Sequence, residues 1–447
     1  MKLLSDVPSR LCSKLAGLAL AIGFSALVAL PHASGQAASS PEKSLVTRPD
    51  VQKALRFIQE NHEANIEKQI AISQTPSSPF AEEQRGKFMA AEFKKLGLAD
   101  VETDPIGNVL GWRRGTSPRT IVIAAHIDTV FPPGTDFTVK RTGTRLNGPG
   151  IQDDSRGLAV LLGLIEALNI GSIKTDYTLL FVGDVGEEGI GNLRGVKYLF
   201  TEGKYKDQLD AFISVDGTSQ NVITNREIGS RRYLVTISGP GGHSWGNFGR
   251  PNPAHALGRV VDKISNLEVL SNPQTDRTSY NVGRIGGGTS VNSVPFEAWF
   301  EFDMRSVSED ELIKLEQKFL KIVDDGVAEE NKFSAAHAKG AFAKGELTVE
   351  KKMIGLRHAI ASTVNGGLVG AASESVRQLE FGAVSLVASS TDSNAVANAG
   401  KPAITVGGGG EAANAHSLQE WFDSKDAYKG IQALLLTVLN FDTETKK

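Results

Sequence analysis

Cysteine is nearly absent from this chain of 447 residues, in which Cys12 is the only example. A single cysteine cannot form an internal disulfide, and it excludes a zinc site built from several thiolates. The chain also lacks an excess of charge of one sign, because its formal net charge is −3. No overall basic field therefore points to a nucleic-acid partner. Any metal ligands must come from histidine, aspartate and glutamate.

Internal repeats and long low-complexity tracts are also absent, and apolar and charged residues make up 40% and 22% of the chain. These fractions are typical of soluble globular proteins, and they exclude a disordered, fibrous or multi-span membrane chain. The length exceeds what one hydrophobic core usually supports, so we expect two domains.

The N-terminus has the pattern of a secretory signal peptide. Basic residues precede an apolar run at 15–30, and small residues follow at 33–37. This order predicts removal of residues 1–37 and export to the periplasm or the cell exterior, with no membrane attachment after cleavage. A membrane anchor is the alternative, but the run is short for a bilayer span.

Four short runs rich in Val, Ile and Phe are nearly all apolar, as expected for strands covered on both faces. Helical patterns separate or flank them. We therefore predict an α/β fold, with a mostly parallel central sheet and flanking helices, over residues 43–231 and 350–447. The predicted strands are Thr120–Ala125, Tyr177–Gly183, Ala211–Val215 and Pro402–Val406, and the predicted helices are Val51–Asn61, Phe88–Leu96, Arg156–Ile170 and Asp423–Leu439.

The pattern changes over residues 232–349, where strands alternate between polar and apolar positions. A β-α-β-β-α-β order predicts an inserted two-layer α+β domain of ferredoxin-like type. Its predicted elements are strands Tyr233–Ser238, Ser279–Ile285, Phe296–Met304 and Leu347–Val349, and helices Pro253–Leu267 and Glu309–Val327.

Imidazoles and carboxylates follow each predicted strand of the central sheet. In open α/β sheets the functional site lies beyond the carboxyl ends of the strands, so we expect these side chains to meet at one edge. A further candidate is Asp153, because Asp154 or Ser155 fits an ordinary helix N-cap and leaves Asp153 free. The residues that follow the strands are His126, Asp128, Glu187, Glu188, Asp216 and His416.

This donor set suits a hard or borderline cation, with zinc as the first expectation. It is too large for one tetrahedral ion and suits two ions about 3.5–4 Å apart with a shared carboxylate. Of the adjacent Glu187 and Glu188, one could bind metal while the other accepts a proton from water. Each residue alone is a weak signal, and the joint placement carries the inference.

Five ordered segments resemble the signatures of the co-catalytic zinc peptidases and amidohydrolases. That family includes peptidase T, carnosinase, bacterial glutamate carboxypeptidase, aminoacylase and succinyl-diaminopimelate desuccinylase, and the similarity spans about residues 50–440. The resemblance implies a hydrolase of amide or peptide bonds with two zinc ions, or cobalt or manganese in their place. The matching segments are His126–Val130, Gly148–Asp154, Gly186–Gly189, Ser214–Gly217 and Ala415–Ser417.

The same resemblance implies individual roles. Glu187 would be the general base, Asp128 would orient the His126 imidazole, and the peptide between Asp153 and Asp154 would be cis. The metal ligands would be His126 and Asp216 on one zinc, Glu188 and His416 on the other, and Asp153 bridging the two.

The insert resembles the family's dimerisation lid, which implies a homodimer. His243 matches a lid histidine that reaches the partner's active site and helps to stabilise the oxyanion. Asn292 and Arg305 match lid residues that contact substrate. An ion pair between Arg305 and Glu301 or Asp303 is an equally weighted alternative.

The substrate is suggested by Asp216-Gly217 and the segment 239–246, which look closest to peptidase T-like members. We therefore expect an aminopeptidase acting on short peptides. Deacylation of N-acyl amino acids and carboxypeptidase activity are alternatives. More remote alternatives are a serine hydrolase using Ser244, which lies in a G-x-S-x-G pattern, and a non-catalytic binding protein.

Overall fold

The computed structural model describes residues 45–269, 271–272, 276–337, 344–360 and 367–444. The predicted signal peptide, residues 1–37, lies outside the described residues. Among the helices of the described ranges, none is long and apolar enough to cross a membrane.

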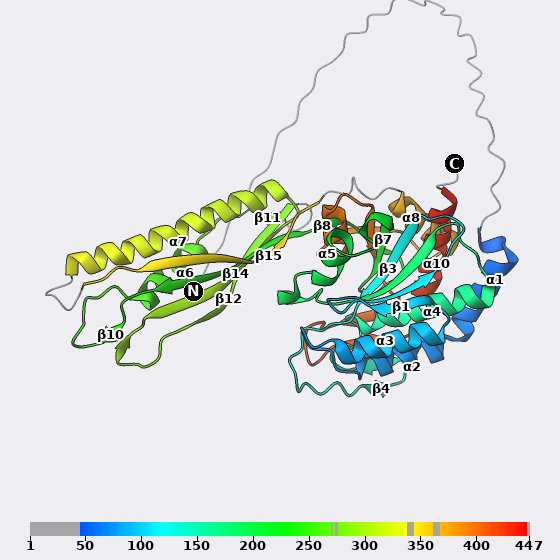
Figure 1. Cartoon of the computed structure of the whole chain (residues 1–447), viewed down its shortest axis with the longest axis horizontal. Coiled ribbons are helices and arrows are strands. Elements are labelled where there is room, and N and C mark those ends of the chain that lie inside the picture. The colour runs from blue at the N-terminus through cyan, green and yellow to red at the C-terminus, as the bar shows by residue number, and fades with distance from the viewer. Residues whose placement is uncertain (1–44, 270, 273–275, 338–343, 361–366, 445–447) are drawn as a thin grey trace, which may run out of the picture. The chain divides into compact units, whose positions relative to one another are not determined.

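An eight-stranded sheet forms the centre of the fold (Figure 1), in the order β1-β2-β6-β3-β7-β17-β8-β16. The four strands from β6 to β17 run parallel to one another. The sheet as a whole is mixed, because β1 and β2 on one side, and β8 next to β17, add antiparallel pairings. Its strands are β1 Ala99–Thr103, β2 Val109–Arg113, β3 Thr120–His126, β6 Thr178–Asp184, β7 Leu209–Val215, β8 Val222–Glu227, β16 Ser385–Ser389 and β17 Ala403–Val406.

The strand β3 shows why the apolar runs do not alternate. Ile121, Ile123 and Ala125 belong to one core, whereas Val122 and Ala124 belong to another on the opposite face of the sheet. Both faces are covered by helices, so every position of the strand must be apolar. This confirms the prediction of strands covered on both faces.

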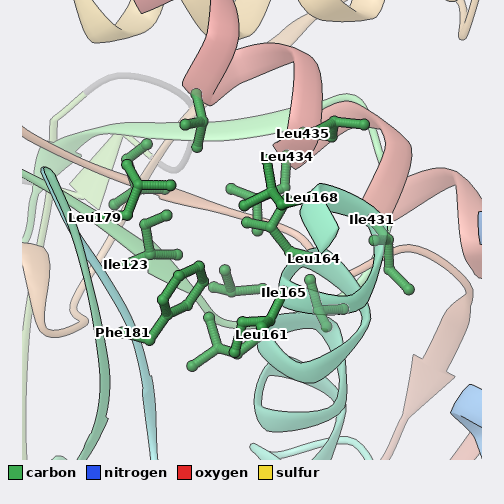
Figure 2. Packing of buried hydrophobic residues seen from close by; sticks show 14 of the residues in the cluster. Ile123, Leu161, Leu164, Ile165, Leu168, Leu179, Phe181, Ile431, Leu434 and Leu435 are labelled. Atoms are coloured by element: carbon green, nitrogen blue, oxygen red, sulfur yellow. The ribbon is translucent and has the colours of Figure 1, made fainter. Parts of the chain in front are cut away.

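Helices cover the two faces unequally. The larger core joins the sheet to α1 Pro49–Glu60, α3 Glu83–Lys95, α4 Ser155–Gly171, α8 Leu368–Gln378 and α10 Tyr428–Glu444. Figure 2 shows its centre, where α4 and α10 meet the sheet. The opposite core includes α5 Arg194–Thr201 and α9 Ser393–Asn398, and α2 His62–Ser73 lies against α4. Short 3-10 turns are η1 Leu45–Thr47, η2 Gly189–Gly191 and η3 Lys206–Gln208.

The helix predicted from Asp423 begins later than expected. Asp423 ends strand β19, Trp421–Asp423, and α10 starts only at Tyr428. The prediction was wrong there because Asp423 pairs with Arg145 and Glu411 in a small four-stranded sheet, a long-range pairing that a helical period cannot reveal. This sheet also contains β4 Lys140–Thr142, β5 Arg145–Asn147 and β18 Glu411–Ala413.

Residues between β8 and α8 form a second, antiparallel sheet in the order β11-β12-β14-β9-β15. One face packs on two helices through alternate residues such as Ala298, Phe300, Phe302 and Met304. The four long strands and two helices confirm the predicted β-α-β-β-α-β order. Their bounds are β9 Gly229–Ser238, α6 Pro253–Ser265, β11 Ser271–Asn272, β12 Asp276–Gly287, β14 Glu297–Ser306, α7 Glu309–His337 and β15 Thr348–Arg357, with a short pair β10 Gly242–His243 and β13 Ser293–Val294.

Candidate metal centre

His126 ends the central strand β3 and is 1% exposed. Its Nε2 lies 3.0 Å from Asp153 Oδ1, and its Nδ1 lies 3.0 Å from the carbonyl oxygen of Asp128. The Asp128 carboxylate is more distant, with Oδ1 at 3.6 Å from Nδ1. If Nδ1 donates to that carbonyl, Nε2 is left unprotonated and can bind a cation.

Asp153 and Asp154 are adjacent but occupy different environments. Asp154 caps the N-terminus of α4 by accepting from the Gly157 amide at 2.8 Å, and it also accepts from the His126 amide at 3.2 Å. The peptide between the two aspartates is cis, as the resemblance implied. A Cβ at Gly157 would lie 2.2 Å from the Val215 carbonyl oxygen, so only glycine fits beside this cap. The Asp153 carboxylate remains available to the two imidazoles.

The loop after β6 brings Glu187 and Glu188 to the same edge. Asp128 holds this loop, because its two carboxylate oxygens accept the amides of Glu187 and Glu188 at 3.0 and 2.9 Å. Both glutamates are nearly buried, at 6% and 7% exposure. Asp128 therefore organises the acidic loop as well as the turn beside His126.

Two groups of potential ligand atoms overlap at Asp153. His126, Asp153 and Asp216 place their atoms within 4.8 Å of one another, and so do Asp153, Glu188 and His416. His416 lies in the loop between β18 and β19 and approaches Asp153 Oδ2 at 3.1 Å and Glu188 Oε1 at 2.8 Å. The structure thus brings together all five residues predicted to bind metal.

The electrostatics of this cluster suit cations. Burial raises the pKa of Glu188 to about 7, and burial followed by the charge of Asp153 raises the pKa of Asp216 to about 8. Hydrogen bonds that His416 donates to Asp153 and Glu188 raise the pKa of His416 to about 11. Crowded carboxylates that favour protons in this way gain a counter-charge from a divalent ion. The donor set of two imidazoles and three carboxylates therefore fits a pair of such ions.

A cavity of about 310 Å³ opens beside the cluster. Its lining includes the acidic residues Asp153, Glu187 and Glu188 and three arginines from the second sheet. A larger cavity of about 960 Å³ is lined by parts of α3 and the 103–107 loop, but by none of the five clustered ligands. The smaller cavity is therefore the candidate active site. Its arginines are Arg232 on β9, Arg305 on β14 and Arg357 on β15.

Arg305 forms one of the two ion pairs that the sequence allowed and also lies at the cavity. Its Nε donates to Asp303 Oδ2 at 2.8 Å, and its side chain, 45% exposed, also lines the cavity. Glu301 pairs instead with Arg284.

His243 and Asn292 lie together, away from the lining of this cavity. His243 lies in β10, Asn292 directly precedes β13, and these two strands pair. The Ser244 amide donates to the Asn292 carbonyl oxygen at 2.9 Å. Ser244 is followed by a turn, and the next helix begins only at Pro253. The strand–serine–helix geometry of a nucleophile elbow is therefore not formed at Ser244.

Two residues near the cluster had no role in the sequence interpretation. Glu420 is fully buried and accepts the amides of Gly150, Gln152 and Asp153 at 3.0, 2.8 and 3.1 Å, so it shapes the loop that carries Asp153. In the sequence, only its position four residues after His416 indicated that Glu420 lies near the site. Arg357 contacts Glu187, but nothing in its sequence surroundings indicates this.

The fold and the clustered ligands define an α/β protein with a candidate two-metal centre. Residues 122–440 match the model of Peptidase family M20/M25/M40, and the chain belongs to this family. This confirms the resemblance inferred from the sequence motifs.

The individual relatives match only part of this chain. The uncharacterized protein YgeY of Escherichia coli K12 is 32% identical over 185 residues, which cover 39% of this chain and 44% of YgeY. The chain spans about half the length of the curated relatives that it matches first.

Two solved structures share the fold. Aminopeptidase PepT from Bacillus cereus has a TM-score of 0.65 at 19% identity, covering 85% of this chain and 98% of PepT. Bacillus subtilis YXEP, a dinuclear metal binding peptidase, has a TM-score of 0.59 at 16% identity, covering 85% of this chain and 98% of YXEP.

Proposed function

We propose that the protein is a dinuclear metal-dependent hydrolase that cleaves amide bonds of short peptides with aminopeptidase-like specificity. The observation that carries the proposal is the pair of ligand triads that share Asp153. The description of YXEP as a dinuclear metal binding peptidase, and of PepT as an aminopeptidase, supports it.

His126 and Asp216 would hold one cation, Glu188 and His416 the other, and Asp153 would bridge them. Zinc is the first expectation, with cobalt or manganese as substitutes. When bound, the ions supply Lewis acidity toward the scissile carbonyl and toward a water molecule.

Glu187 would act as the general base. It lines the cavity beside Asp153 and Glu188, and its Oε1 is bound by Arg357 at 3.0 Å. Among the described residues, none donates a hydrogen bond to Oε2, so this oxygen can accept a proton from the attacking water and return it to the leaving amine. The Asp128 carboxylate keeps Glu187 in place by accepting a hydrogen bond from the Glu187 amide.

The insert would act as a dimerisation lid. His243 and Asn292 are outside the cavity of their own chain, which suits residues that reach a partner's site. Exposed apolar side chains lie near them, including Trp245 at 88%, Phe248 at 81% and Val291 at 103% exposure. Such side chains are typical of interfaces, and sedimentation analysis would show whether a homodimer forms. Export after loss of residues 1–37 is part of the same proposal, and N-terminal sequencing of secreted protein tests it.

A second candidate is deacylase or carboxypeptidase activity. Arg305 favours it, because an exposed guanidinium in the cavity can bind a substrate carboxylate in a bidentate manner. The two candidates differ in the end of the substrate that must be free.

Hydrolysis of a di- and tripeptide panel with free and blocked amino termini, together with N-acyl amino acids, tests these proposals after defined zinc loading. We expect cleavage that a chelator abolishes, a requirement for a free amino terminus, and two metal equivalents per chain. Cleavage of only amino-blocked substrates would favour the second candidate, and the absence of bound metal would refute both.

A further inference from the structure

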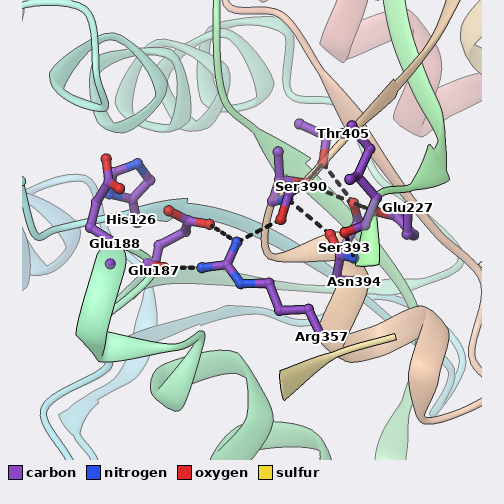
Figure 3. A network of polar contacts seen from close by, with 12 residues as sticks. His126, Glu187, Glu188, Glu227, Arg357, Ser390, Ser393, Asn394 and Thr405 are labelled. Atoms are coloured by element: carbon purple, nitrogen blue, oxygen red, sulfur yellow. Dashed lines mark hydrogen bonds and ion pairs between the residues drawn. The ribbon is translucent and has the colours of Figure 1, made fainter. Parts of the chain in front are cut away.

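Two arginines of the second sheet reach the loop that carries Glu187 and Glu188. Arg357, the last residue of β15, donates from Nη2 to the Glu187 carbonyl oxygen at 2.6 Å and from Nη1 to Glu187 Oε1 at 3.0 Å (Figure 3). Arg232 on β9 donates from Nη1 to the Gly189 carbonyl oxygen at 2.6 Å. The loop is therefore held at two backbone carbonyls from outside the central sheet.

Few N–H groups of Arg357 remain available to bind a substrate. Nη1 also donates to Ser390 Oγ at 3.0 Å, and the side chain is only 4% exposed. Its Nε is buried and has no partner among the described residues. Because Nε is shielded from solvent, its N–H cannot pair with a neighbouring N–H to bind a substrate carboxylate in a bidentate manner. Arg305, with 45% of its side chain exposed, is better suited to that role.

Arg357 contacts both the main chain and the side chain of Glu187. One guanidinium binds the carbonyl oxygen and Oε1 of the same residue, so the bonds close a ring that fixes the side-chain torsions of Glu187. Arg232 binds Gly189, which lies two residues after Glu187, and so limits movement of the loop. Its guanidinium also binds Asp303 Oδ1 through Nε at 2.9 Å, which anchors it to β14.

We propose that Arg357 is a positioning residue that keeps the Glu187 carboxylate in its catalytic orientation, with Arg232 securing the same loop. This inference rests on the proposed function of Glu187. Because Arg357 belongs to β15, the hold links the second sheet directly to the acidic loop.

Kinetics of zinc-loaded variants test the role. In Arg357→Ala we expect kcat to fall about 10²-fold with KM nearly unchanged, since small displacements of a reacting group have effects of this size. The loss should be equal for peptides with free and amidated carboxyl termini. Arg357→Lys should remain impaired, because an ammonium group cannot reproduce the fork. Millimolar guanidine should restore part of the activity of Arg357→Ala, whereas methylammonium should not.

Hydrogen–deuterium exchange gives a readout that does not depend on activity. In metal-free protein, the peptide spanning residues 185–191 should exchange about tenfold faster in Arg357→Ala than in wild type. The matched control is Arg284→Ala, which removes an exposed arginine of the same sheet that pairs with Glu301. Exchange and kcat should both stay at wild-type values in this control.

Three results would overturn the inference: an unchanged kcat, a KM increase confined to peptides with a free carboxylate, or unchanged exchange at 185–191. If Arg357→Ala does not fold, the same measurements on Arg357→Lys decide. If wild type cleaves no peptide but Arg357→Ala still exchanges faster, the proposed function fails while the structural hold stands.

Discussion

Glu227 provides a test of the electrostatics at the junction between the two sheets. It ends β8, is 3% exposed, and accepts a hydrogen bond from Ser393 Oγ at 2.9 Å (Figure 3). Burial raises its pKa from 4.5 to about 8, and the Ser393 hydrogen bond offsets this only in part. The folded protein therefore retains a proton that the unfolded chain releases.

This difference decides how the free energy of unfolding changes with pH. Below pH 4.5 both states carry the proton, and Glu227 does not change stability with pH. Between pH 4.5 and pH 8 only the folded state carries it, so the free energy of unfolding falls by about 1.4 kcal/mol per pH unit. Above pH 8 both states are ionised and the loss is complete. Glu227→Gln cannot ionise and avoids this loss.

Urea denaturation at several pH values, with a chelator present throughout, measures the effect. The stability of Glu227→Gln relative to wild type should increase between pH 5 and pH 8, by an amount up to roughly 4 kcal/mol. Glu411→Gln, at an exposed position, should follow wild type at every pH. Parallel pH profiles for Glu227→Gln and wild type would refute the reasoning.

Two further outcomes concern the metal site, and a third concerns the helix cap beside it. Glu187→Gln should abolish turnover but retain both metal equivalents by elemental analysis, and retained activity would exclude Glu187 as the base. His416→Ala should lose one equivalent and keep the other, because the triad of His126 is untouched; retention of both would contradict its assignment. Gly157→Ala should lower the free energy of unfolding by about 1–3 kcal/mol in urea titrations, since its Cβ would overlap the Val215 carbonyl oxygen; a wild-type midpoint would contradict this.

The central strands and the ligand cluster were predictable because they depend on local patterns. All-apolar runs such as Thr120–Ala125 identify buried strands, and parallel strands deliver their C-terminal residues to one edge. Asp153 could be distinguished from Asp154 because only one of them was needed as a helix cap. These inferences needed no knowledge of long-range contacts.

Contacts between distant segments could not be read from the sequence. Glu420 binds amides some 270 residues earlier in the chain, and Arg357 binds Glu187 across 170 residues. Their side chains have no periodicity that indicates a partner. The strand β15 was expected only around Leu347–Val349, but it continues to Arg357, since its polar residues pair with β9 through the backbone.

The pairing of β9 with β15 has a consequence for engineering. Ser230 and Arg357 are register partners in adjacent antiparallel strands, so the polypeptide enters and leaves the second sheet at neighbouring points. Cα atoms of such partners are about 4.5–5.5 Å apart, a gap that a very short linker can bridge. The whole segment between Ser230 and Arg357 could thus be replaced by a tight connection. The resulting minimal scaffold would present the acidic and imidazole groups without the arginines of the second sheet.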